Sequence, residues 1–194
     1  MSKKNAKNTK GKIITAAWDL FYEQGYDDTT VEEIIERSGT SKGSFYHYFE
    51  GKDGLLGSLS YIFDEEYEKL QATISDDMGA FEKLLYLNRE LFSVIEERID
   101  IDLLTRLYST QLVTKGEKHL LDNKRLYYKL LRKIVTDGQK KGELTDEMTV
   151  NEIVKLYAMC ERALIYDWCL CNGEYSLYSY TKTVMPIFLS KIRL

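Results

Sequence analysis

Apolar residues recur at spacings of three and four along most of this 194-residue chain, a pattern typical of helices that bury one face. The first such segment, TKGKIITAAWDLFYEQGY, predicts a helix that Gly25 ends. The next helix begins after Thr30, which has the capping-box spacing to Glu33, and it ends at Gly39. A third helix, KGSFYHYF, follows after a tight turn. Two short helices joined by such a turn, with a longer helix before them, predict a helix-turn-helix.

The helical pattern continues through the rest of the chain. It predicts a fourth helix from near Lys52 to about Leu70 and, after a polar break, further helices at roughly 79–97, 100–113, 118–141, 149–171 and 175–192. One proline and 12 glycines are few helix breakers for a chain of this length. The sequence therefore predicts an all-α fold, with a small three-helix domain over residues 1–55 and a larger helical domain over residues 56–194.

Composition narrows the class of protein. Charged residues make up 30% and hydrophobic residues 44%, an ordinary balance for a soluble protein. The most apolar run, LYAMCERALIYDWCLC, is broken by charges, so we expect no membrane span. The basic N-terminus precedes no apolar signal core, and the three clustered cysteines form no CxxC, so we expect a protein of the reducing cytoplasm. Net charge is −4, yet residues 1–12 carry five lysines and no acid, either as a solvated tail or as an arm for phosphates.

The third predicted helix carries more aromatic residues than one buried face can hold. Phe45 and Phe49 are four apart, so both can enter the core from one face. The rest of the segment then forms an outward surface of hydroxyls, an imidazole, an ammonium and aromatic rings: Ser41, Lys42, Gly43, Ser44, Tyr46, His47 and Tyr48. Such groups donate to phosphates and contact base edges. For an isolated helix, half-buried tyrosines at the rim of a helical hairpin are the simpler interpretation. Here the helix pair, the caps and the basic arm agree on DNA binding.

The segment TTVEEIIERSGTSKGSFYHYFEGKDGLL resembles the DNA-binding signature of the TetR family of bacterial transcriptional regulators in order, spacing and residue type. The resemblance covers about residues 9–56. It implies an N-terminal DNA-binding domain and a C-terminal domain that binds an effector and forms a homodimer. It also implies phosphate contacts from Thr30, Tyr46, Tyr48 and Lys52, and base contacts from Lys42, Gly43 and His47, with Ser41 and Ser44 completing the surface. The sequence departs from the family's common residues at Ile35, Ser38, Thr40 and Glu50.

The C-terminal domain is long enough to enclose a pocket, and most of the 15 tyrosines lie in it. Candidates for an aromatic, apolar lining are Tyr86, Tyr108, Tyr127, Tyr157, Glu161, Tyr166 and Trp168. A carboxylate such as Glu161 among aromatic rings would suit a cationic aromatic effector. The alternative is that these residues are ordinary core, with the acids solvated.

The last two predicted helices carry apolar stripes. Their candidate interface residues are Leu156, Cys160, Leu164, Met185, Phe188, Leu189 and Ile192. These stripes fit either an intramolecular core or a four-helix dimer interface built from two helices of each subunit, and the family resemblance favours the dimer.

Four functions compete at this point. The first is a repressor that a small-molecule effector releases from a pseudo-palindromic operator, and the second is an activator or coactivator on the same fold. The third is an architectural DNA binder without an effector, which the large second domain disfavours. The fourth is an enzyme, which is disfavoured because the chain has two histidines and no GxSxG, HExxH or phosphate-binding glycine loop. We expect no cofactor and no metal.

Overall fold

The computed structural model describes residues 3–113, 115 and 118–194, and in these residues helices dominate and no strand occurs. One isolated antiparallel bridge joins Leu144 to Arg193. The predicted all-α fold is confirmed. The side chains of residues 1–8, which include three lysines of the basic arm, lie outside the described part. None of the described helices has both the length and the low charge needed to cross a bilayer.

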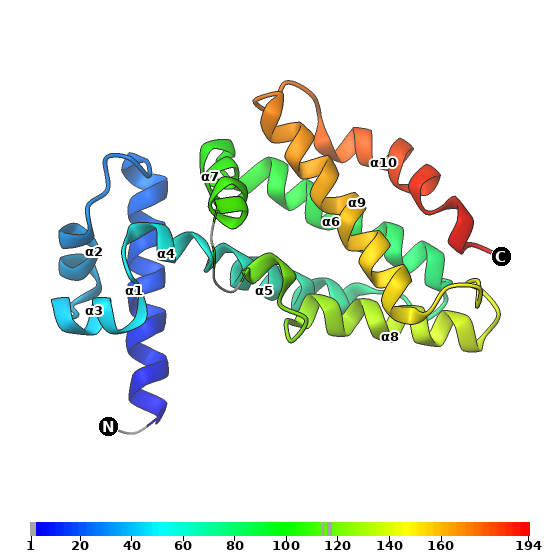
Figure 1. The fold of residues 1–194 in the computed structure, drawn as a ribbon, viewed down its shortest axis with the longest axis horizontal. Helices are drawn as coiled ribbons and strands as arrows, with labels where there is room; N and C mark the ends of the chain where they lie inside the picture. The colour runs from blue at the N-terminus through cyan, green and yellow to red at the C-terminus, as the bar shows by residue number, and fades with distance from the viewer. Residues whose placement is uncertain (1–2, 114, 116–117) are drawn as a thin grey trace.

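Helices α1 (Lys3–Gln24), α2 (Val31–Ser38) and α3 (Lys42–Tyr48) form the N-terminal unit (Figure 1). Thr30 and Glu33 form the predicted capping box at the start of α2. Gly39 ends that helix with a φ of 61°, a left-handed conformation that glycine adopts without strain. Ser41 then caps α3. The helix-turn-helix of the sequence is therefore present, with its turn at Gly39.

The predicted fourth helix is two helices, α4 (Lys52–Leu56) and α5 (Leu59–Thr73). Long-range contacts meet at this break. A Cβ at Gly57 would collide with the imidazole of His119, and the Ser58 hydroxyl accepts the indole N–H of Trp18 at 2.8 Å. This junction is where α1, α4 and the segment before α8 meet.

The C-terminal part contains α6 (Ala80–Arg98), α7 (Ile101–Val113), α8 (Leu126–Lys140), α9 (Val150–Leu170) and α10 (Leu177–Phe188), with 3-10 turns at His119–Leu121 and Ser190–Ile192. The helix predicted over 118–141 starts late. Asp122 accepts the backbone N–H of Lys124 at 2.9 Å, a local turn that competes with helix geometry, and α8 begins only after it.

The helices of the C-terminal part pack in two layers. α5, α6 and α8 lie against one another, α9 crosses α8, and α10 covers α6 and α9 (Figure 1). α7 packs against both α9 and α4, so it joins the two parts of the molecule. Its Arg106 pairs with Asp27 and lies 4.9 Å from the ring centroid of Tyr26, in the loop between α1 and α2. Buried residues from Ile13 to Ile192 form one continuous core.

Candidate DNA interface and effector domain

Helix α3 separates its aromatic residues as the sequence predicts. Phe45 and Phe49 are buried, at 0% and 7% exposure. Tyr46 is 48% exposed, His47 is also exposed, and Tyr48 is half-buried with its ring 4.8 Å from that of His47. The two buried phenylalanines fix the rotation of the helix, so Tyr46 and His47 face outward while Tyr48 packs partly against the core.

The start of α3 is ordered by a local hydrogen bond. The Ser41 hydroxyl accepts the backbone N–H of Ser44 at 3.1 Å, and both Lys42 and Gly43 are exposed. The Lys42 ammonium lies 3.4 Å from the carboxylate of Glu32, and both side chains are mostly solvated. A surface pair of this kind contributes little free energy. Lys42 can therefore exchange Glu32 for a nucleic-acid acceptor at small cost.

Thr30 is exposed at the start of α2, and its hydroxyl is engaged by Glu33. The hydroxyl donates to the Glu33 carboxylate at 2.8 Å and accepts the Glu33 backbone N–H at 3.2 Å. Hydrogen bonds from the backbone and hydroxyl of Thr30 lower the pKa of Glu33. A hydroxyl has one proton to donate, so a phosphate contact from Thr30 requires rotation away from Glu33.

Lys52 has a different environment from the one that the family resemblance implies. Its ammonium donates to the backbone carbonyls of Tyr26, Asp27 (3.2 Å) and Thr29 (2.8 Å), and it lies 4.3 Å from the Tyr26 ring centroid. An ammonium has three donors, and three carbonyls take them. This arrangement indicates that Lys52 stabilises the loop between α1 and α2, rather than contacting phosphate.

Glu161 is the centre of a buried polar network in the C-terminal part. Its carboxylate accepts from Asn88 of α6 at 3.0 Å and from the Tyr127 hydroxyl of α8 at 2.6 Å, and Asn88 in turn accepts from Thr181 of α10. Burial raises the pKa of Glu161, while the bonds from Tyr127 and Asn88 and the charge of Arg162 oppose that rise. One carboxylate on α9 therefore links three other helices.

A small cavity lies beside this network. It has a volume of about 40 Å³, and Tyr67, Tyr108, Tyr127 and Glu161 line it together with apolar side chains. The Tyr67 hydroxyl is buried and has no hydrogen-bond partner among the described residues. A cavity of this size holds roughly one water molecule. A larger ligand does not fit this cavity unless the side chains or helices around it move.

Of the remaining residues predicted to line the pocket, only Tyr157 lies near Glu161. Tyr157 is fully buried near Glu161 and donates its hydroxyl to the backbone of α6. Trp168 donates its indole N–H to the chain beyond the end of α9, Tyr166 is 47% exposed, and Tyr86 hydrogen-bonds α5 at the surface. Tyr86, Tyr166 and Trp168 therefore do not line the cavity, although Trp168 is buried in the core.

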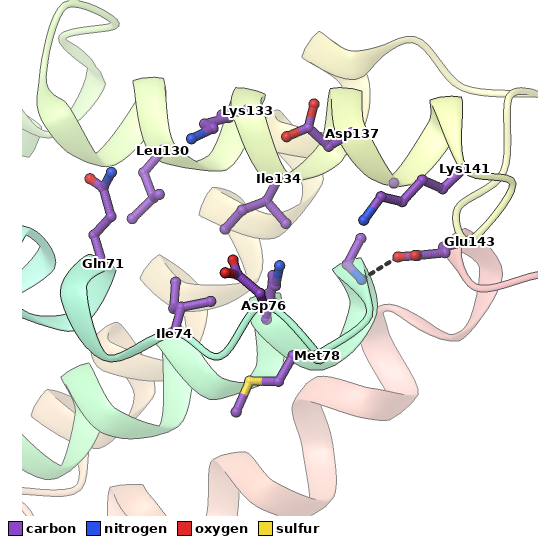
Figure 2. Close-up of a pocket in the computed structure, with 13 residues that line it drawn as sticks. Gln71, Ile74, Asp76, Met78, Leu130, Lys133, Ile134, Asp137, Lys141 and Glu143 are labelled. Carbon is purple, nitrogen blue, oxygen red and sulfur yellow. Dashed lines mark hydrogen bonds between the residues drawn. The ribbon is translucent and has the colours of Figure 1, made fainter.

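A second hollow, of about 350 Å³, lies between α8 and the turn that leads into α6 (Figure 2). The carboxylate of Glu143 accepts the backbone N–H of Ala80 there. Lys133, Asp137 and Lys141 line its α8 side, and its other charged residues are likewise of both signs. This balance of charge favours no particular class of ligand.

The apolar stripes of α9 and α10 face the protomer's own core. Of the candidate interface residues, Phe188 is 43% exposed and Leu156 is half-buried, whereas the others are buried: Cys160, Leu164, Met185, Leu189 and Ile192. Buried side chains cannot contact a second copy, so a dimer interface on these helices would use their opposite, exposed face. That face carries exposed apolar residues at helical spacing: Met159, Tyr166, Leu170, Tyr180, Ile187 and Phe188.

Comparison with known proteins identifies two matching regions. Residues 13–59 match the model for bacterial regulatory proteins of the tetR family. Residues 63–191 match the model for the C-terminal region of YsiA-like proteins, so this second match covers well over half of the chain. The chain belongs to the TetR family. The resemblance seen in the helix-turn-helix sequence is thereby confirmed.

Relatives along the whole chain are also transcriptional regulators. This TetR-family chain is 24% identical over 185 residues to the fatty acid metabolism regulator protein of Bacillus subtilis (strain 168), covering 93% of this chain and 94% of that one. The structure of FadR from Bacillus subtilis in complex with stearoyl-CoA superposes with a TM-score of 0.68 at 22% identity, over 95% of this chain and 100% of that one. The structure of Thermus thermophilus FadR in complex with lauroyl-CoA superposes with a TM-score of 0.73 at 20% identity, over 95% of both chains. At these identities, the two structures establish a shared fold.

Sequence reasoning missed several residues that organise the site. Asn88, Thr181 and Tyr67 belong to the Glu161 network or its cavity, and Arg106 joins α7 to the loop that Lys52 holds. No local motif marks them, because each acts through contacts with residues far away in the sequence. The spacing of Met159, Tyr166 and Leu170 could have revealed the second apolar face of α9.

Proposed function

We propose that the protein is a homodimeric transcriptional repressor, which leaves its operator when a small-molecule effector occupies the C-terminal domain. Residues 1–55 bind DNA, and residues 56–194 bind the effector and form the dimer. The protein acts in the cytoplasm, where its operator is. The observation that carries the proposal is the outward surface of α3, which exposes Tyr46 and His47 while Phe45 and Phe49 lock the helix onto the core. The family membership of the chain supports it.

On DNA, α3 enters the major groove. Lys42, Gly43 and His47 contact base edges, and Thr30, Tyr46 and Tyr48 contact phosphates, with Ser41 and Ser44 beside them. Lys52 does not belong to the proposed phosphate contacts, because its three N–H donors are hydrogen-bonded to carbonyls of the loop. A two-fold dimer reads two half-sites about 34–36 Å apart, so the operator is a pseudo-palindrome.

The small cavity beside Glu161 explains why an effector would change the conformation. A ligand larger than roughly one water molecule cannot occupy this cavity in the conformation described here, so an effector that fills the cavity binds a state in which the helices around it have moved apart. A ligand shifts an equilibrium only by its difference in affinity between two states, and this requirement supplies such a difference. The relatives crystallised with stearoyl-CoA and lauroyl-CoA make an acyl-CoA the first effector to test.

Helix α7 is the route by which movement would reach the DNA-binding part. It packs on α9 beside the cavity and on α4, and its Arg106 pairs with Asp27. Lys52 and Asp53 of α4 bind the same loop through Tyr26 and its neighbours. A shift of α7 therefore acts on the loop that leads into α2, the first helix of the helix-turn-helix.

The direct test is operator selection from a random DNA pool, followed by release with candidate effectors. The proposal predicts enrichment of a pseudo-palindrome, lower output from a reporter that carries this site, and recovery of output with the effector. Higher output on binding would identify an activator instead. Enrichment of no sequence at all would contradict the proposal.

A further inference from the structure

A groove between α8 and α9 has the chemistry of an anion-binding site. Its volume is about 720 Å³, within the range of small-molecule pockets. Tyr128 and Arg132 come from α8, and Lys155, Ala158 and Arg162 come from α9. Asparagine side chains and a few apolar residues complete the lining.

The charge of this groove has one sign. Among its described lining residues, Arg132, Lys155 and Arg162 are cationic and no residue is a carboxylate, although the whole chain has a net charge of −4. Arg132 donates to the carbonyl of Asn123 at 2.7 Å, and Arg162 donates to the Tyr128 hydroxyl at 3.4 Å. A guanidinium has five N–H donors, so both arginines keep donors for a ligand. Clustered arginine and lysine side chains of this kind bind phosphates and carboxylates.

The groove adjoins the cavity beside Glu161. Ala158 and Arg162, one turn apart on α9, line both spaces. The cavity has a mostly apolar lining, to which Arg125 and Glu161 add charged groups, and it contains the unpartnered hydroxyl of Tyr67. A polar, cationic outer groove that meets a mostly apolar inner cavity suits a ligand with a charged head and an apolar tail.

We propose that this groove binds the phosphate-bearing head of an amphipathic effector, with Arg132, Lys155 and Arg162 holding the phosphates and the apolar tail entering the cavity past Ala158. The inference rests on the proposed function, because it names the class of the effector. Operator DNA is a poor occupant, since α3 lies at the other end of the molecule from α8 and α9 (Figure 1). The tail enters by displacing the helices around the cavity, which is the movement that release from DNA requires.

The test is isothermal titration of the full-length protein with lauroyl-CoA, free CoA and laurate. Lys155→Glu and Arg132→Gln remove groove charges from different helices. Lys129→Glu makes the same charge change as Lys155→Glu at an exposed position of α8 that does not line the groove. We expect lauroyl-CoA to bind the unmodified protein most tightly of the three. We expect at least a tenfold loss in each groove variant and less than a twofold change in Lys129→Glu.

Three results would overturn the inference. The first is equal binding of lauroyl-CoA by Lys155→Glu and Lys129→Glu. The second is no binding of lauroyl-CoA or CoA. The third is that laurate binds as tightly as lauroyl-CoA, which would mean that the groove recognises a carboxylate head and not a phosphate-bearing one. The proposed function is judged separately, by operator binding measured without any of these ligands. A protein that selects an operator but ignores lauroyl-CoA remains a regulator of the proposed kind with another effector.

Discussion

Lys52 occupies a position where the family resemblance implies a phosphate contact, yet its side chain stabilises the fold. Its ammonium joins α4 to the carbonyls of Tyr26, Asp27 and Thr29, and so closes the loop before α2. A lysine that contacts phosphate would instead release counterions on binding, and each such contact contributes roughly 0.9 to the slope of log affinity against log salt. Stability and salt dependence therefore separate the two roles.

We predict that Lys52→Ala lowers the stability of the free protein by about 2 kcal/mol, because charged hydrogen bonds to the backbone are lost. The salt slope of operator binding stays unchanged. Thermal denaturation and binding at several salt concentrations measure both quantities, with Lys129→Ala as the control. An unchanged melting temperature with a shallower slope would restore Lys52 to the phosphate contacts.

Glu161 has a testable effect on stability. Burial raises its pKa above the ordinary value of 4.5, so the folded state binds the proton more tightly than the unfolded state does. The stability that this carboxyl contributes is then fully present below pH 4.5 and is lost as the pH rises toward the folded-state pKa.

We predict that Glu161→Gln flattens this decline and makes the protein more stable than the unmodified chain at pH 7 and above. Denaturant unfolding at a series of pH values measures the effect, and the exposed Glu174→Gln is the control. If stability instead falls with Glu161→Gln at every pH, the hydrogen bonds of the carboxylate outweigh its burial.

At the scale of elements, the short helices depend on their ends. α2 and α3 have eight and seven residues, too short to be stable alone, so caps and packing decide whether they form. Gly39 holds the left-handed position between them. Gly43 lies inside α3 in open space, where the nearest group to an added Cβ would be the Ser41 hydroxyl, 4.0 Å away.

We predict opposite effects for two glycine substitutions. Gly39→Ala destabilises the protein by about 1–2 kcal/mol because alanine is strained at positive φ. Gly43→Ala stabilises it by up to about 1 kcal/mol yet weakens operator binding, because the added methyl group keeps α3 away from the bases. Chemical denaturation and anisotropy with operator DNA test the pair. Tighter operator binding by Gly43→Ala would remove this residue from the interface.

The accuracy of sequence reasoning also differed between elements. The caps at Thr30, Gly39 and Ser41 act within a few residues, so α2 and α3 could be predicted, together with the buried Phe45 and Phe49. The break between α4 and α5 depends on Gly57 meeting His119, 62 positions away, and no local pattern contains that contact. α9 is apolar on two sides, so periodicity alone did not show which side the protomer buries.

At the scale of the whole molecule, the exposed apolar face of α9 and α10 needs an occupant. Met159, Tyr166 and Leu170 of α9 and Tyr180 and Ile187 of α10 are each at least 47% exposed in the single chain. The family's dimeric assembly makes a second copy the natural partner.

We predict that Ile187→Glu converts a dimer into a monomer without unfolding it, because this side chain is 64% exposed and a charge in an apolar interface is unpaired. Light scattering coupled to size-exclusion chromatography measures the mass. Lys182→Glu, at an exposed position of the same helix, should remain dimeric. A dimer that survives Ile187→Glu would place the interface elsewhere.

Sequence-specific reading of DNA by α3 is tested most directly by fluorescence anisotropy of the dimer on its selected operator, with excess non-specific competitor. We predict binding that survives competitor in the unmodified protein. We also predict at least a tenfold loss of this specific binding in His47→Ala, with an unchanged melting temperature because the side chain is exposed. If His47→Ala and Tyr46→Ala each bound the operator as tightly as the unmodified protein does, α3 would not be the surface that reads DNA.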